Sequence, residues 1–329
     1  MPSPAGAPAP AAPARLTASA TGLYAIAATP FRDDGEVDFD SARSLMDFYL
    51  ACGATGVTIL GIMGEAPKLS GDESLELVRT VLKQVAGKVP VVVGVSTAGL
   101  DNLTQFARRV SDIGAAGVMV APLANLRTDE QIYSYFEQIA ERLGDIPWVL
   151  QDYPQTTTVH MAPYLIIRMI QDFERLVMFK HEDWPGLGKI TALREAARQG
   201  GRRVSILVGN GGIHYPQELG RGADGAMTGF AYPDALVATR DFYLAGKRDD
   251  AEDVYDAYLP LIRHELQPGL GLAIRKHLLQ RRGAIRNGRL RAPGPTLGVL
   301  DLQEIDHLVR RMERRTRQLG LGQPIAFPR

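Results

Sequence analysis

Short apolar segments alternate with longer amphipathic segments along most of the chain. The apolar segments are too short for helices and carry few polar residues, which is typical of strands buried on both faces of a parallel sheet. They occupy residues 23–27, 57–60, 90–95, 118–120, 148–150, 176–179, 204–208 and 226–228. Between them, residues 41–51, 72–85 and 129–143 place apolar side chains at helical spacing. The pattern predicts eight strands separated by helices.

A glycine-containing phrase recurs at residues 53–57, 114–118 and 222–226. Each copy ends a helical pattern and begins an apolar segment, where glycine suits a helix C-cap and a tight turn into a strand. The copies are separated by close to two and three βα units of roughly 30 to 35 residues. Eight such units predict an α/β fold, a (β/α)8 TIM barrel. The competing doubly wound sheet is disfavoured because no GxGxxG motif follows the first strand.

Three regions are expected along the chain. Residues 1–20 are rich in proline and alanine and are expected to form a disordered tail. Residues 21–232 hold the eight apolar segments and form the barrel. Helical patterns continue beyond the eighth strand, so residues 233–329 are expected to form a C-terminal helical segment.

The composition of the chain limits the classes of binding partner that we expect. The 329 residues carry no net charge, which argues against nucleic acid or an anionic membrane as a partner. No segment approaches the ~18 apolar residues of a membrane span. The single cysteine, Cys52, cannot form an intrachain disulfide, and no Cys/His cluster suggests a metal. These features favour a cytoplasmic protein that acts on a small molecule without a metal.

Lys180 is the first candidate for chemistry, because it stands at the end of the sixth apolar segment. Active sites of (β/α)8 barrels lie where the strands end. A lysine that leaves an apolar layer there is partly desolvated, which disfavours the ammonium form and releases a nucleophilic amine. Such an amine forms a Schiff base with a ketone. The alternative is a strand-end lysine that merely reaches water.

Several short motifs occur in a characteristic order. They are Thr29-Pro30-Phe31, the G-x-x-G-E loop at residues 61–65, Phe179-Lys180, Gly209-Asn210-Gly211 and Arg291-Ala292-Pro293. Together they resemble the dihydrodipicolinate synthase / N-acetylneuraminate lyase family of class I Schiff-base lyases. The resemblance covers most of the chain outside the tails. It implies a TIM barrel with a C-terminal helical segment, a homotetramer and no cofactor.

The resemblance also assigns roles to individual residues. It makes Lys180 the Schiff-base lysine and a 2-oxo acid the substrate. The loop residues Ile62, Met63, Gly64 and Glu65 would then lie beside the carboxylate of that acid. For Glu65, a purely structural role is the alternative, through hydrogen bonds to the backbone.

The same resemblance makes Gly209 and Met227 substrate-binding residues. They lie at the ends of the seventh and eighth strands. Glu182 lies two residues beyond Lys180. Because side chains alternate along a strand, it is expected to share the face of Lys180 and to contact substrate.

The chain departs from the family pattern at three places, one of which is the loop after the fourth strand, where residues 122–125 lack the tyrosine pair of the synthases. Ile62 and Met63 replace a pair of small hydroxyl residues, so their side chains cannot donate a hydrogen bond to the substrate, whereas the backbone N–H groups of this turn could still hold a carboxylate. Gln151 stands where the family has a proton-shuttling tyrosine, and an amide cannot exchange a proton near neutral pH. Tyr153 lies two residues further on and is expected on the same face. It is either a substitute for the missing tyrosine or a wall residue.

These residues lead to one main functional hypothesis. We expect a lyase of the aldolase or dehydratase type, acting on pyruvate or its aldol adducts through a lysine imine and an enamine. Gln151 and the 61–65 loop would orient the substrate, and Tyr153 or Glu182 would move protons. The alternatives are a barrel that binds a 2-oxo acid without turnover, and an imine-based decarboxylase or deaminase.

Overall fold

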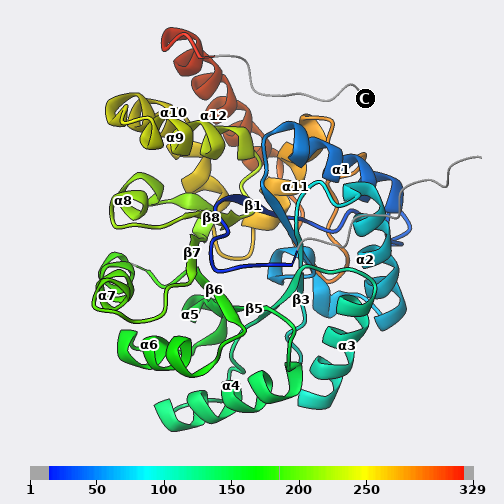
Figure 1. The fold of residues 1–329 in the computed structure, drawn as a ribbon. Coiled ribbons are helices and arrows are strands. Elements are labelled where there is room, and N and C mark those ends of the chain that lie inside the picture. The colour runs from blue at the N-terminus through cyan, green and yellow to red at the C-terminus, as the bar shows by residue number, and fades with distance from the viewer. Residues whose placement is uncertain (1–14, 185, 322–329) are drawn as a thin grey trace, which may run out of the picture.

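A closed barrel of parallel strands forms the centre of the molecule (Figure 1). The computed structural model describes residues 15–184 and 186–321. Neighbouring strands in the barrel are consecutive in sequence, and the first pairs with the last. The strands are β1 (Gly22–Ile26), β2 (Gly56–Ile59), β3 (Val91–Gly94), β4 (Gly117–Val120), β5 (Trp148–Asp152), β6 (Leu176–His181), β7 (Ser205–Val208) and β8 (Gly225–Thr228). The predicted TIM barrel is therefore confirmed.

Helices surround this barrel, and those from the C-terminal part of the chain extend beyond it. Those of the first half are α1 (Phe39–Ala51), α2 (Gly71–Val85), α3 (Leu100–Asp112), α4 (Asp129–Leu143), α5 (Pro154–Thr157) and α6 (Pro163–Asp172). Those of the second half are α7 (Leu187–Arg198), α8 (Tyr215–Gly220), α9 (Pro233–Leu244), α10 (Arg248–Glu265), α11 (Gly271–Arg281) and α12 (Val299–Gln318). No helix among the described residues is long and apolar enough to cross a membrane.

The structure moves both of the expected region boundaries. The first moves by a few residues and the second by one helix. Residues 1–14 lie outside the described part of the chain, but residues 15–20 lie within it. Leu16 is buried, and its backbone N–H donates to the carbonyl of Ala116 at 2.9 Å. At the other boundary, α9 packs against β1 and thus completes the ring of helices around the barrel. The added segment therefore begins with α10.

An apolar layer fills the inside of the barrel. Its side chains come from alternate positions of the strands, as the pleat requires, and Leu16 packs beneath them. The strand residues are Tyr24, Ile26, Val92, Met119, Val149, Met178, Leu207 and Met227. The interior is therefore a packed core, and polar chemistry is confined to the carboxyl ends of the strands.

A buried ion pair joins α11 to those strand ends. The ammonium of Lys276 is fully buried, donates to Glu65 Oε1 at 3.0 Å and to the carbonyl of Thr29 at 2.9 Å, and lies 4.6 Å from the ring centre of Phe31. The second carboxylate oxygen of Glu65 accepts from Lys68 Nζ at 2.7 Å. The loops after β1 and β2 are thus held to the C-terminal segment by compensated charges.

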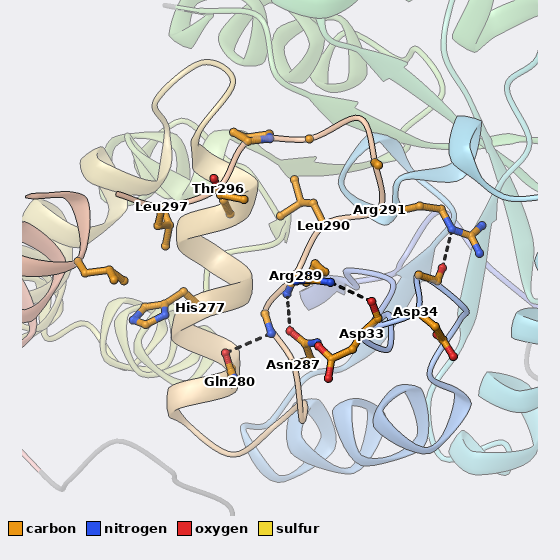
Figure 2. A pocket seen from close by; sticks show the side chains of 17 residues that line it. Asp33, Asp34, His277, Gln280, Asn287, Arg289, Leu290, Arg291, Thr296 and Leu297 are labelled. Atoms are coloured by element: carbon orange, nitrogen blue, oxygen red, sulfur yellow. Dashed lines mark hydrogen bonds between the residues drawn. The ribbon is translucent and has the colours of Figure 1, made fainter. Parts of the chain in front are cut away.

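The segment after α11 folds back over the loop that follows β1, as Figure 2 shows. Asn287 Nδ2 donates to Asp33 Oδ1 at 2.9 Å, and Arg289 Nη1 donates to the Asp33 carbonyl at 2.9 Å. Between them and α11 lies a surface cavity of about 580 Å³, which His277 and Gln280 help to line. These contacts give α11 a second attachment to the barrel.

Removing the buried ammonium should destabilise the protein. We expect Lys276→Met to lower the free energy of unfolding by about 2–4 kcal/mol, because Glu65 and the Thr29 carbonyl would lose a buried donor while Lys68 remains paired with Glu65. Urea denaturation measures this. Lys88→Met, at an exposed turn after α2, is the control and should change stability by no more than about 0.5 kcal/mol. Equal effects of the two substitutions would show that the buried pair has no special structural weight.

Candidate active site

A cavity of about 480 Å³ opens at the carboxyl ends of the strands. Its walls come from the strand ends, from the loop after β2 and from the segment between α10 and α11. Six of the residues predicted from the sequence line it together: Lys180, Tyr153, Gln151, Glu182, Ile62 and Met63. The predicted site is therefore a physical cavity at the end of the barrel where (β/α)8 enzymes carry their chemistry.

Lys180 reaches the cavity from the inner face of β6. It lies two residues after Met178, which belongs to the apolar layer of the barrel, so both side chains point inward. Only 4% of Lys180 is exposed. In the register of the sheet, Lys180 is directly opposite Gln151 of β5. An amine at this position is shielded from bulk water but is open to a ligand in the cavity.

Glu182 holds its carboxylate between these two side chains. Its Oε2 lies 2.9 Å from Lys180 Nζ and accepts from Gln151 Nε2 at 2.7 Å. The backbone of Glu182 is fixed as well, since its N–H donates to the carbonyl of Asp152 at 2.9 Å and its carbonyl accepts from Asn210 Nδ2 at 2.8 Å. The carboxylate is therefore held in one place beside the amine.

Gly209 makes room for this carboxylate. It follows β7, and a Cβ atom built on it would overlap the Cγ and Oε1 atoms of Glu182. The φ of Gly209 is −108°, so the backbone conformation alone does not demand glycine. Gly209 is absent from the cavity lining, and its contribution is the space that it leaves behind Glu182.

Tyr153 lies at the first turn of α5 and not within β5. It lines the cavity as expected, with its side chain partly buried. Burial, and to a smaller degree the nearby Glu182 carboxylate, raise the pKa of Tyr153 above its ordinary value. Its phenol is therefore protonated near neutral pH and can donate a hydrogen bond to a ligand.

Three further predicted residues lie away from the cavity surface. Gly64 is buried in the loop after β2, where its carbonyl accepts from Thr29 Oγ1 at 2.6 Å. Glu65 directs its carboxylate to Lys276 and Lys68. Met227 packs inside the apolar layer of the barrel, while the next residue, Thr228, reaches the cavity.

Two charged cavity residues escaped the sequence reasoning, and both come from the C-terminal segment. Glu265 ends α10 and Arg275 lies in α11, and the two form a buried ion pair with Arg275 Nε 2.9 Å from Glu265 Oε2. Burial raises the pKa of Glu265 to about 7, and Arg275 opposes this shift. A helical pattern does not show which face covers the barrel, so no local signal singled out this pair.

The arrangement combines the parts that imine chemistry needs. Lys180 supplies the amine, and Glu182 supplies a carboxylate within hydrogen-bond distance of it, which is the relation between a nucleophile and its base. Among the described residues, no group of three or more His, Cys, Asp or Glu side chains is arranged to hold a metal ion.

Known proteins resemble this chain over nearly its whole length. The model of the dihydrodipicolinate synthetase family matches residues 19–311. An L-2-keto-3-deoxyarabonate dehydratase of Azospirillum brasilense is 34% identical, over 91% of this chain and 97% of its own length. A 4-hydroxy-tetrahydrodipicolinate synthase of Methanococcus maripaludis is 28% identical, over 74% of this chain and 82% of its own length.

A solved structure agrees with these matches. A dihydrodipicolinate synthase from Rhodopseudomonas palustris has a TM-score of 0.89 and 49% identity, and the alignment covers 91% of this chain and 99% of that structure. The family match, the relatives and the cavity at the end of the barrel agree, and the chain belongs to the dihydrodipicolinate synthetase family.

Proposed function

We propose that this protein is a Schiff-base lyase that removes water from a 2-oxo-3-deoxy sugar acid. Lys180 provides the amine and Glu182 moves the protons. The observation that carries the proposal is the buried Glu182 carboxylate, which lies 2.9 Å from Lys180 Nζ and is oriented by Gln151. A carboxylate can both accept and return a proton, whereas the amide of Gln151 can do neither.

The first stage forms the imine. The Lys180 amine attacks the carbonyl carbon C2, and the carbonyl oxygen leaves as water, which gives a protonated imine. The iminium withdraws electrons from C3, so a C3 proton becomes acidic and its loss gives a neutral enamine. Glu182 is placed to accept this proton, because its carboxylate lies within hydrogen-bond distance of the nitrogen that becomes the imine.

The second stage expels the hydroxyl group on C4. The enamine returns its electron pair to form a C3–C4 double bond, and the C4–O bond breaks. Glu182 donates the proton that it took from C3 to the departing oxygen, which leaves as water. Hydrolysis of the imine then restores the Lys180 amine. One carboxylate thus serves as base and then as acid, and the net change is the loss of one water molecule.

Relatives support two reactions through this enamine. The Azospirillum brasilense protein that covers most of this chain is named as a dehydratase of L-2-keto-3-deoxyarabonate, which favours the dehydration. The Rhodopseudomonas palustris structure is named as a synthase, so aldol addition or cleavage of a 2-oxo acid is the second candidate. In that reaction Glu182 would exchange a proton with the hydroxyl group of the aldol adduct. A barrel that only binds the acid would form neither the dehydration product nor the aldol product.

We expect the enzyme to work in the cytosol as a homotetramer. The resemblance to the family implies the tetramer, and the single cysteine suits a reducing compartment. That cysteine, Cys52, is buried, and burial raises its thiol pKa to about 12, so it is unreactive. Light scattering of the purified protein measures the assembly directly.

Lys180→Ala should abolish imine formation. We expect borohydride to trap pyruvate or L-2-keto-3-deoxyarabonate on the wild-type chain, with a gain in intact mass, and to trap nothing on the variant. Product 18 mass units lighter than the sugar acid should form only with the wild type, since loss of water defines the reaction. Labelling that persists in the variant would place the imine on another lysine. Labelling of the wild type without any product would favour the non-catalytic barrel.

Glu182→Gln should separate binding from turnover. The amide keeps the size of the side chain but cannot exchange protons, so we expect turnover to fall by roughly 10²–10⁴-fold. Pyruvate should still be trapped by borohydride, which shows that the cavity and the amine survive. Stopped-flow or steady-state assays of water loss give the rate. A rate within about threefold of wild type would assign the proton transfer to another group, with Tyr153 as the next candidate.

Gly209→Ala tests whether the position of the Glu182 carboxylate matters for turnover. The added methyl group would collide with Glu182 and displace it, so turnover should fall at least tenfold while the fold is retained. Gly188→Ala is the matched control, because Gly188 lies in α7 with open space around the position of its Cβ. Steady-state kinetics of both variants, with circular dichroism as a check of the fold, would decide. Equal rates for the two variants would mean that the position of Glu182 is unimportant.

A further inference from the structure

A buried ammonium group lies behind the candidate site, between the barrel and α7 on its outside (Figure 1). It belongs to Lys189 of α7, and its Nζ atom donates to Asp152 Oδ2 at 2.6 Å and lies 2.8 Å from Asp183 Oδ2. Asp152 is fully buried and ends β5, whereas Asp183 stands two residues beyond the end of β6. One ammonium thus connects the chain segments at the ends of two neighbouring strands.

The two carboxylates belong to sequence neighbours of the residues that form the site. Asp152 follows Gln151, and Asp183 follows Glu182. Because side chains alternate along an extended chain, Asp152 points outward to α7 while Gln151 points into the cavity. The backbone adds another link, since the N–H of Glu182 donates to the carbonyl of Asp152 at 2.9 Å. The direction of the Glu182 carboxylate therefore depends on contacts that lie outside the cavity.

These outer groups have no access to a ligand in the cavity. Lys189, Asp152 and Asp183 are absent from its lining, whereas Gln151 and Glu182 are part of it. The ammonium of Lys189 can therefore influence the chemistry only through the residues whose backbone it fixes.

Stability alone is a poor explanation for this group of charges. Two carboxylates share one ammonium, and the second oxygen of Asp152, Oδ1, is buried without a hydrogen-bond partner in the described part of the chain. His181 Nδ1 lies 3.9 Å from Asp152 Oδ2, which is too far for a hydrogen bond. Apolar residues of similar volume often equal or exceed the stability of a buried ion pair, so a role in geometry accounts better for charges that leave polar atoms unpaired.

We infer that Lys189 is a positioning residue, whose ammonium holds the ends of β5 and β6 so that the Glu182 carboxylate meets the Lys180 amine. This inference rests on the proposed function, in which Glu182 moves the proton. Without the ammonium, the carboxylates of Asp152 and Asp183 repel each other and the chain after β6 shifts. Misplacement of a reacting group by about 1 Å can slow a reaction about 100-fold, and the Glu182 contact with the amine is only 2.9 Å long.

The test uses a partial reaction that does not depend on the identity of the natural substrate. When pyruvate forms the imine, Glu182 removes a proton from C3, and in heavy water the enamine takes a deuteron back at the same carbon. Proton NMR follows the loss of the methyl signal, and borohydride trapping with intact mass follows imine formation separately. In Lys189→Met, exchange should slow about 10–100-fold, while the pyruvate concentration for half-maximal trapping should change by less than about threefold.

Two further variants separate positioning from a loss of stability. Arg194→Met removes another buried ion pair of α7, with Asp224 just before β8, so it disturbs the same helix at the opposite end of the barrel. It should leave exchange and trapping unchanged. Lys189→Met combined with Asp152→Asn removes both charges of the inner pair, so stability in urea should recover while exchange stays as slow as in the single variant. The double variant also decides the question if Lys189→Met alone fails to fold.

Each outcome of these assays supports or overturns the inference. Slow exchange with normal trapping, in Lys189→Met or in the double variant, supports it. Three results would make Lys189 a purely structural residue: normal exchange in Lys189→Met, exchange that recovers with stability in the double variant, or equal slowing in Arg194→Met. An equal loss of exchange and trapping would do the same.

Failure of the proposed function is recognised separately, because the wild type would then not exchange the protons of pyruvate. Crystal structures of the wild type and of Lys189→Met decide the inference in that case. The distance from Glu182 Oε2 to Lys180 Nζ should increase beyond about 3.5 Å in the variant, which is too long for a hydrogen bond. A carboxylate that stays in place would overturn the inference.

Discussion

Compensation of buried charge at the carboxyl end of the barrel is the constraint on which the site depends. Lys276 is fully buried there, and its ammonium is acceptable only because Glu65 and the Thr29 carbonyl receive it. This contact fixes α11 against the loops after β1 and β2. The preceding residue, Arg275, is carried by the same helix but points to the cavity wall beside β8. The C-terminal segment therefore contributes to the site because a charge pair outside the cavity holds it there.

Sheet register determines the centre of the site in a similar way. Gln151 and Lys180 are direct partners across β5 and β6, so their side chains leave the barrel at the same height. Glu182 follows one step beyond β6 and turns its carboxylate onto both of them. In this geometry the amide is a scaffold for the carboxylate. Gln151 thus has a structural use, since its amide holds the Glu182 carboxylate beside the Lys180 amine.

Much of this architecture was predictable from the sequence. Strands buried on both faces are strongly apolar, so their positions were visible, and alternation along the strand correctly placed Lys180 and Glu182 on one side of the cavity. Alternation does not report depth, however, and the side chain of Met227 packs within the apolar layer. Lys276, one partner of Glu65, is 211 residues away in sequence, and Arg275 is one of several basic residues in its helix. Long-range contacts of this kind leave no local pattern.

The apolar layer inside the barrel restricts how a ligand enters and leaves the cavity. Side chains from the strands fill the interior, and Leu16 packs beneath them, so the cavity does not continue through the barrel. A ligand must therefore enter and leave on the side of the barrel where the strands end. A molecule of product that stays in this cavity occupies the space of the next substrate molecule, so a slowly departing product would compete with substrate.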